Sequence, residues 1–186
     1  AMACARHLLA GAEGSDDEVP QVEPASAGRR GPLPVLGRLP HALAEAEWVA
    51  DCAAAALQEG QRPAQLVVLA PTKEQLRPIA AQLRRRGLAL QGQHEDGFRR
   101  FDWAADTVKL MSFHAAKGLE FPWVAIAGLQ ALPLRQDSED DALRLLYVAM
   151  TRSTERLLLS ACGETPLVQR VAQALGEVGR RFADAA

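Results

Sequence analysis

A short polar turn near the middle of the chain carries most of the side chains that could do chemistry. Two strand-like apolar runs, residues 108–111 and 123–127, border this turn. Its polar residues and its glycine are Ser112, His114, Lys117, Gly118 and Glu120. In open α/β sheets, polar groups at the ends of strands and helices, set on an apolar frame, build ligand sites. The turn is therefore the first candidate for a binding site.

Arg152 is a second candidate, because it stands where a helical run gives way to a third strand-like run, residues 157–160. A guanidinium is always charged and can bind phosphate oxygens with two donors at once. Arg152 could therefore contact a phosphorylated ligand. The alternative is that it caps the last carbonyls of the preceding helix, and the residues alone favour this simpler role.

Alternating strands and helices must position these residues. Apolar periodicity predicts helices over residues 43–59, from Thr72 to Gly87, from Ser138 to Met150 and over 165–175. Strands are predicted at residues 66–70, 88–91, 108–111, 123–127 and 157–160. Such alternation implies parallel pairing with right-handed crossovers. We expect an α/β fold of three layers, α/β/α, with a mostly parallel sheet of about five strands.

Local signals define two helix starts. Thr72 with Gln75, and Ser138 with Asp141, have the spacing of capping boxes. Pro78 would then fall inside the first helix, where it removes a backbone donor. That helix should therefore either kink or begin near Arg77.

The chain of 186 residues is long enough for one domain with a sizeable core. Residues 1–40 are predicted to be a short helix, over residues 2–10, followed by a flexible linker rich in Gly, Pro, Ser and acids. Residues 41–178 should form the folded domain, and residues 179–186 a tail.

Composition excludes several classes of function. The net charge of −2 gives no overall basic field, so any nucleic-acid binding must be local. Cys4, Cys52 and Cys162 are far apart and form no C-x-x-C pair, which suggests neither a metal site nor a disulfide framework. The longest mostly apolar run, residues 121–134, is shorter than the ~20 residues that a membrane span needs. We expect a cytoplasmic protein that binds no membrane.

Two further segments have two possible roles each. The aromatic residues Phe98, Phe101 and Trp103 lie in a polar loop, where they could stack on bases or fix the loop to the core. The run Arg84-Arg85-Arg86 could bind phosphate or form a solvated helix end that complements the helix dipole. In both cases the structural role is the simpler expectation.

Two long motifs then carry a resemblance to a known family. V-K-L-M-S-F-H-A-A-K-G-L-E-F, from Val108, resembles motif V of the UvrD/Rep-type superfamily I DNA helicases, and L-R-L-L-Y-V-A-M-T-R-S, from Leu143, resembles their motif VI. The order, the separation and the acidic run before the second motif also agree. The clear resemblance covers residues 108–160, and a weaker one covers residues 43–91.

The resemblance implies the C-terminal, second RecA-like domain (P-loop NTPase-type) of an ATP-dependent DNA helicase. An N-terminal RecA-like domain of the same protein would complete the ATP site and bind most of the ATP and Mg. The chain has no G-x-x-x-x-G-K-[ST] loop and no asparagine-tyrosine-arginine motif, so the chain alone should not hydrolyse ATP. Residues 92–106 leave no room for the large inserted subdomain of UvrD and Rep, which indicates a short form.

Residue roles follow from the resemblance. Arg152 would be the arginine finger that reaches the γ-phosphate. Glu120 would bind the ribose and Gly118 would allow close approach of the nucleotide. Ser112 and His114 would face single-stranded DNA. Lys117 would bind a phosphate or an acid across the cleft. Arg144 would pair across the same cleft, whereas Tyr147 is expected to be structural.

Each of these roles has a simpler alternative. Glu120 could be a surface acid, and His114 could be a structural hydrogen-bonding residue. At the level of the whole protein, one alternative is a helicase-like factor that remodels a protein partner such as RNA polymerase. Another is a docking module without motor function.

Overall fold

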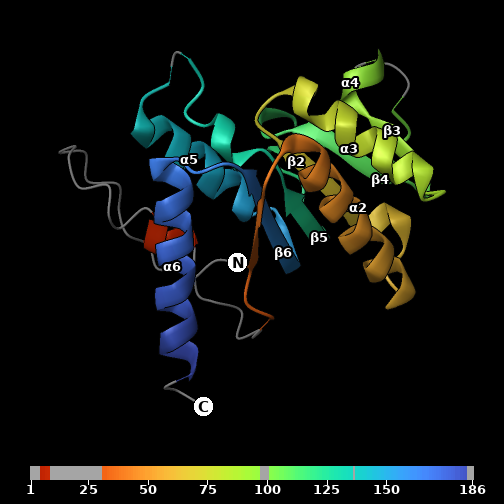
Figure 1. The fold of residues 1–186 in the computed structure, drawn as a ribbon. Helices are drawn as coiled ribbons and strands as arrows, with labels where there is room; N and C mark the ends of the chain where they lie inside the picture. Colours follow the sequence, from red (N-terminus) through yellow and green to blue (C-terminus); the bar gives the residue numbers. More distant parts are fainter. Residues whose placement is uncertain (1–4, 9–30, 97–100, 136, 184–186) are drawn as a thin grey trace.

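The computed structural model describes residues 5–8, 31–96, 101–135 and 137–183, and it shows a parallel sheet between two layers of helices (Figure 1). The strand order is β1-β6-β5-β2-β4-β3 and the pairings are parallel. The strands are β1 (Val35–Leu39), β2 (Leu66–Ala70), β3 (Leu90–Gly92), β4 (Val108–Ser112), β5 (Phe121–Ile126) and β6 (Ser153–Cys162). The predicted α/β fold is confirmed.

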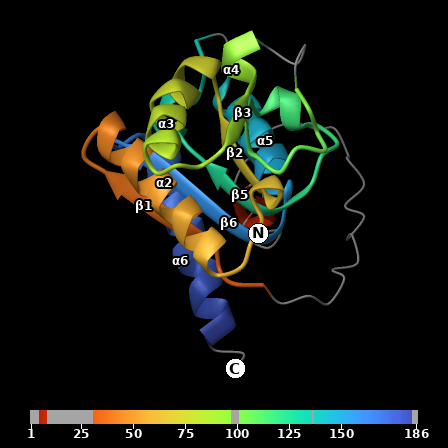
Figure 2. The ribbon, with the colours of Figure 1, turned by 90° about the vertical axis from the view of Figure 1, so that its right-hand side faces the viewer.

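Helices cover both faces of this sheet. They are α2 (Ala42–Gln58), α3 (Lys73–Arg85), α4 (Gln93–Asp96), α5 (Glu139–Met150) and α6 (Pro166–Ala183), with 3-10 turns at η1 (Pro63–Gln65), η2 (His114–Ala116) and η3 (Leu129–Ala131). In Figure 2, α2 and α3 lie in front of the sheet and α5 lies behind it. Residues 5–8 are helical, and they pack on the α5 and α6 side through Ala5 and Leu8.

Side chains of the central strand β2 belong to two separate hydrophobic cores, one on each face of the sheet. Val67 packs into the cluster under α5 and α6, whereas its neighbour Val68 packs into the cluster under α2 and α3. The strand is buried along its whole length. A strand that is buried on both faces reads as a continuous apolar run, which is why L-V-V-L-A predicted it correctly.

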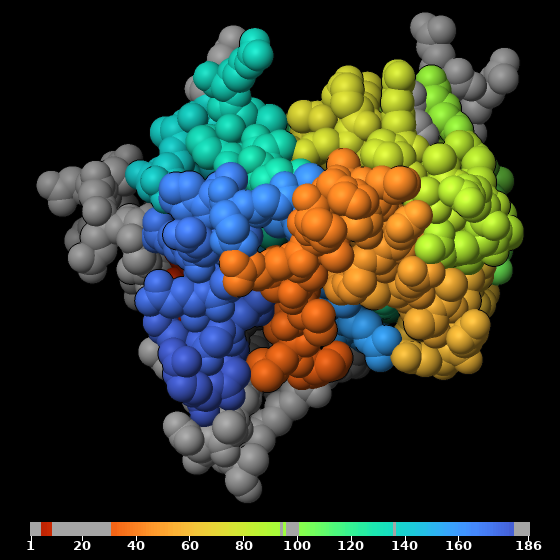
Figure 3. Space-filling view, in the orientation of Figure 1, coloured from red at the N-terminus to blue at the C-terminus, as the bar shows by residue number. Residues whose placement is uncertain are grey.

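Within the described residues the sheet has six strands rather than about five, because β1 forms inside the segment that is predicted to be a linker. β1 pairs with β6, with Val35 opposite Leu158 and Leu39 opposite Cys162. As an edge strand, it is exposed along part of its length, and Figure 3 shows its segment on the surface between α6 and α2. Its sequence therefore lacks the continuous apolar run that marks the inner strands.

Helix boundaries also differ from the predictions in two places. Helix α3 begins at Lys73 and continues through Pro78, so the predicted later start near Arg77 is wrong. Helix α6 extends to Ala183, so residues 179–183 are not a tail. Both predicted capping boxes are present; for example, the Gln75 Oε1 accepts a hydrogen bond from the backbone N of Thr72 at 3.1 Å.

One connection determines where the candidate site residues lie. β4 and β5 both run parallel to β2 and flank it, so residues 113–120 must cross from the end of β4 to the beginning of β5. We call the side of the sheet where the strands begin the amino edge, and the side where they end the carboxyl edge. The crossover therefore starts at the carboxyl edge and finishes at the amino edge.

Candidate functional site

Arg152 and Glu120 stand at the starts of two neighbouring strands, at the amino edge. Arg152 directly precedes β6, and Glu120 directly precedes the neighbouring strand β5. The backbone N of Phe121 donates a hydrogen bond to the Arg152 carbonyl at 2.9 Å, and the Arg152 guanidinium donates to the Leu119 carbonyl at 3.1 Å. Arg152 is therefore bonded to the residues on both sides of Glu120. Two sequence motifs that are about thirty residues apart along the chain therefore lie side by side at this edge.

The Arg152 guanidinium also caps helix α5. Its Nε donates to the Val148 carbonyl at 3.0 Å, and a terminal nitrogen donates to the Thr151 hydroxyl at 3.0 Å. The capping alternative is thus observed. A guanidinium has five N–H donors, and the contacts to described residues use three of them, so two remain for another acceptor. Because Arg152 is only half-buried, capping does not exclude contact with a ligand.

The end of the crossover presents Glu120 to solvent. Lys117, Gly118 and Glu120 are exposed, whereas Leu119 is half-buried and packs against the core. Gly118 has a φ of +82°, and a Cβ there would meet nothing within 4 Å. Backbone conformation, rather than crowding, therefore favours glycine at this position.

Ser112 and His114 lie at the opposite, carboxyl edge. Ser112 is the last residue of β4, and its backbone N donates to the Gln93 Oε1 at 3.0 Å. His114 begins η2 and is exposed. Between the two edges the crossover is anchored by Phe113 and Ala116, which are buried in the core. The structure therefore separates the predicted site residues into two groups, one at each edge.

A buried carboxylate at the carboxyl edge was missed by the sequence analysis. Glu45 in α2 is 5 % exposed, and its Oε1 accepts hydrogen bonds from the Gly128 backbone N at 2.8 Å and the Ser160 hydroxyl at 2.7 Å. Gln75 donates to the Gly128 carbonyl at 3.2 Å. This network fixes the start of the loop from β5 to α5. One signal in the sequence points to this burial. Glu45 lies four residues before Val49, so the two residues share the buried face of α2.

Gly128 allows this network to form. Its φ is +79°, and a Cβ at this position would clash with the Gln75 side-chain nitrogen. Any side chain at this position would therefore displace Gln75, which holds the Gly128 carbonyl. Both the positive φ and the close approach of another residue require glycine here.

The loop before β4 is organised around a buried lysine. The Lys109 Nζ donates to the carbonyls of Asp102 and Ala105, at 3.1 and 2.9 Å, and to the Thr107 hydroxyl at 2.7 Å. Desolvation lowers the pKa of Lys109, although Asp102 and Asp106 oppose this shift. The Nζ also lies 5.6 Å from the centroid of the Phe101 ring.

The loop aromatics have different environments. Phe101 packs against the core. The predicted structural role, in which an aromatic ring fixes the loop to the core, is therefore confirmed for this residue. Trp103 is 48 % exposed, with its ring centroid 4.6 Å from that of Phe101. Phe98 lies outside the described residues.

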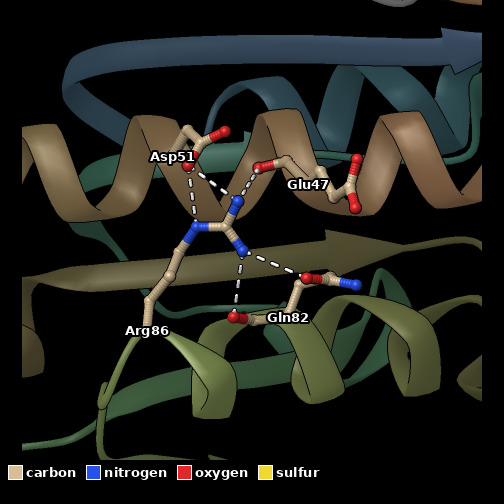
Figure 4. A network of polar contacts seen from close by, with 4 residues as sticks. All are labelled: Glu47, Asp51, Gln82 and Arg86. Carbon is tan, nitrogen blue, oxygen red and sulfur yellow. Dashed lines mark hydrogen bonds and ion pairs between the residues drawn. The ribbon is translucent and has the colours of Figure 1, made fainter.

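The arginine run at the end of α3 forms contacts within the protein. Arg86 donates to the Asp51 carboxylate at 2.7 Å and to the Glu47 and Gln82 carbonyls, and so joins α3 to α2 (Figure 4). Arg84 forms an ion pair with Glu95. These contacts support the structural role for the run.

Two remaining candidates lie on α5. Hydrogen bonds from Ser138 lower the pKa of Asp141, and the exposed Arg144 adds a smaller contribution in the same direction. Tyr147 is half-buried and packs against the core, as expected for a structural residue.

The described residues contain no group of three or more His, Cys, Asp or Glu that could hold a metal ion. None of the described helices has the length and apolar character needed to cross a membrane.

Comparison with known proteins agrees with this architecture. Residues 89–164 match the UvrD-like helicase C-terminal domain. The ATP-dependent DNA helicase Rep of Escherichia coli K12 is 42% identical over 65 residues, which cover 32% of this chain and 10% of Rep. DNA helicase II of the same organism is 35% identical over 94 residues, which cover 47% of this chain and 12% of that protein. The chain therefore spans about a tenth of the length of these relatives.

Solved structures give the same result. The C-terminal domain of a possible DNA helicase from Lactobacillus plantarum WCFS1 superposes with a TM-score of 0.63 and 25% identity, covering 80% of this chain and 86% of that domain. The SWI2/SNF2 ATPase core of Sulfolobus solfataricus, at 11% identity and a TM-score of 0.54, shares the fold alone and covers 77% of this chain and 30% of that core. The fold is that of a RecA-like helicase domain. More narrowly, residues 89–164 are similar to the UvrD-like helicase C-terminal domain.

Proposed function

We propose that this chain is the second motor domain of an ATP-dependent, UvrD-like DNA helicase. The observation that carries the proposal is the pair of contacts that join Arg152 to both neighbours of Glu120 at the amino edge. The names of the relatives, which are ATP-dependent DNA helicases, support it. An N-terminal RecA-like domain of the same protein would close the ATP site from the other side.

At the amino edge, each side chain has a defined task. The two remaining donors of Arg152 bind phosphate oxygens and stabilise the charge that develops as the γ-phosphate is transferred. The exposed carboxylate of Glu120 accepts hydrogen bonds from ribose hydroxyls. The positive φ of Gly118 turns the backbone so that Glu120 faces the nucleotide. Arg144, exposed on α5, pairs with an acid across the cleft.

The first domain binds most of the ATP and the magnesium ion. A Walker loop supplies backbone amides, a lysine and a magnesium-binding hydroxyl, and this sequence has none. Among the described residues there is also no cluster of acids suited to a metal ion. The residues at the amino edge fit the outer part of a nucleotide, because they provide one carboxylate and one guanidinium.

At the carboxyl edge, Ser112 and His114 contact the phosphates of single-stranded DNA, and Lys117 adds a positive charge further along the crossover. The contacts must be local, because the net charge of the chain is −2. The crossover thus links a nucleic-acid contact to a nucleotide contact through residues anchored by Phe113 and Ala116. It is a physical route by which ATP hydrolysis and DNA binding influence each other.

The decisive experiment is substitution of Arg152 in the intact protein. Arg152→Ala should slow ATP turnover by roughly 10³–10⁵, with nucleotide still bound. Arg152→Lys should not restore turnover, because lysine lacks the planar fork. Arg156→Ala is the matched control, because Arg156 is a β6 arginine that pairs with Glu59. Near-normal turnover of Arg152→Ala, or an unfolded domain, would mean that helix capping is the whole role of Arg152.

A further inference from the structure

Thr151 joins the end of α5 to the guanidinium of Arg152. Its hydroxyl donates a hydrogen bond to the Val148 carbonyl at 2.8 Å and accepts one from a terminal nitrogen of Arg152 at 3.0 Å. The Arg152 Nε donates to the same Val148 carbonyl at 3.0 Å. The three groups therefore form a closed ring of hydrogen bonds.

This ring limits where the guanidinium can lie. The Leu119 carbonyl accepts from the other terminal nitrogen at 3.1 Å, so three acceptors hold the planar group. Two of these acceptors are backbone carbonyls, and the third is the side chain of Thr151. Among the three, the Thr151 hydroxyl is the one that a substitution can remove without changing the backbone.

We propose that Thr151 is a positioning residue for Arg152. Its hydroxyl keeps the plane of the guanidinium fixed, so that the two remaining N–H donors face the phosphate of ATP. The inference rests on the proposed function, in which Arg152 contacts the nucleotide. Donors that are already oriented need no reorganisation when charge develops in the transition state. Loss of the Thr151 hydroxyl should therefore reduce the rate of hydrolysis rather than the affinity for ATP.

The test uses two substitutions of Thr151 in the intact protein, assayed for ATP turnover. Thr151→Val keeps the shape of the side chain and removes the hydroxyl, and it should lower kcat about tenfold with little change in KM for ATP. Thr151→Ser keeps the hydroxyl and should restore kcat to within about twofold of the starting protein. A loss that Thr151→Ser fails to rescue would overturn the proposal.

Ser153 provides a matched control. Its hydroxyl is two residues away, and Ser153 is 7 % exposed, but its Oγ has no hydrogen-bond partner among the described residues. Ser153→Ala should therefore leave kcat unchanged. An unchanged kcat would show that loss of a buried hydroxyl near Arg152 does not by itself slow turnover. A fall in kcat equal to that of Thr151→Val would overturn the specific role of Thr151.

The same substitutions in the Arg152→Ala background separate this inference from the proposed function. If Thr151 acts through Arg152, Thr151→Val should not lower kcat further in that background. An equal loss in both backgrounds would make Thr151 merely structural. Near-normal turnover of Arg152→Ala alone would overturn the proposed function. A slow Arg152→Ala with a normal Thr151→Val would overturn only the positioning role.

Discussion

The two edges of the sheet hold their acidic residues in different ways. At the amino edge, Glu120 is exposed, and two donors of the neighbouring Arg152 have no acceptor among the described residues. At the carboxyl edge, Glu45 is buried, and one of its oxygens accepts two hydrogen bonds from the protein. A buried carboxylate with internal partners fixes the fold, whereas an exposed one next to available donors can meet a ligand. Charge alone therefore does not identify a site, but charge together with its partners does.

The largest effect expected from this comparison is complete loss of activity in the isolated chain. The amino edge supplies only half of the proposed ATP site. The sequence has no Walker loop, which would bind the phosphates of ATP. The purified chain should release no phosphate from ATP above the level of its Arg152→Ala variant. Phosphate release measured over time is a sufficient assay. Turnover above that control would contradict the half-site interpretation.

Loss of DNA stimulation should follow from changes at the carboxyl edge. In the intact protein, replacing Ser112 and His114 together by alanine should leave basal hydrolysis nearly unchanged and reduce stimulation by single-stranded DNA. Neutral contacts to phosphate release no counterions, so the salt dependence of DNA binding should barely change. The measurement is ATPase rate against DNA concentration at several salt levels. An equal loss of basal and stimulated rates would mean that the crossover is only structural.

The amino edge should show the reverse pattern. Glu120→Ala should raise KM for ATP, because the ribose loses an acceptor, while DNA affinity without nucleotide persists. A hydrogen bond to a charged group contributes about 1.5–3 kcal/mol, which corresponds to roughly a tenfold to hundredfold change. Glu155→Ala is a suitable control, because Glu155 is exposed near the start of β6. If both variants behave alike, Glu120 is a surface acid.

The smallest effect on turnover is expected at the buried carboxylate. Glu45→Ala leaves the Gly128 N–H and the Ser160 hydroxyl without their acceptor, at a cost of about 1–3 kcal/mol in the free energy of unfolding. Chemical denaturation of the chain measures this cost. Glu74→Ala, at an exposed position in α3, is the control. Equal stability of the two variants would show that the network does not stabilise the fold.

Local sequence patterns predicted the inner part of this fold well. The continuous apolar run of β2 and the capping boxes at Thr72 and Ser138 are properties of neighbouring residues, and the structure contains all of them. The edge strand β1 was missed because part of its length is exposed, so its sequence resembles that of a loop. A strand of this kind is defined by its partner, β6, which lies more than a hundred residues further along the chain.

The candidate site could be predicted only as separate motifs. The residue types of Glu120 and Arg152 suggested ligand contacts, but nothing local indicates that Arg152 binds the Leu119 carbonyl. The hydrogen-bond partners of Glu45 and Lys109 could not be predicted from the sequence either. Each of these contacts depends on the order of strands in the sheet or on the path of a loop, which periodicity does not specify.

The position of β1 has a practical consequence for anyone who expresses this domain. A protein cut at residue 41, where the sequence suggests that the compact part begins, would lose the strand that covers β6 between Leu158 and Cys162. An uncovered, largely apolar strand offers unpaired backbone groups to the same strand of another molecule. Such a shortened protein should self-associate and precipitate, whereas the chain of 186 residues keeps the strand in place and stays dispersed.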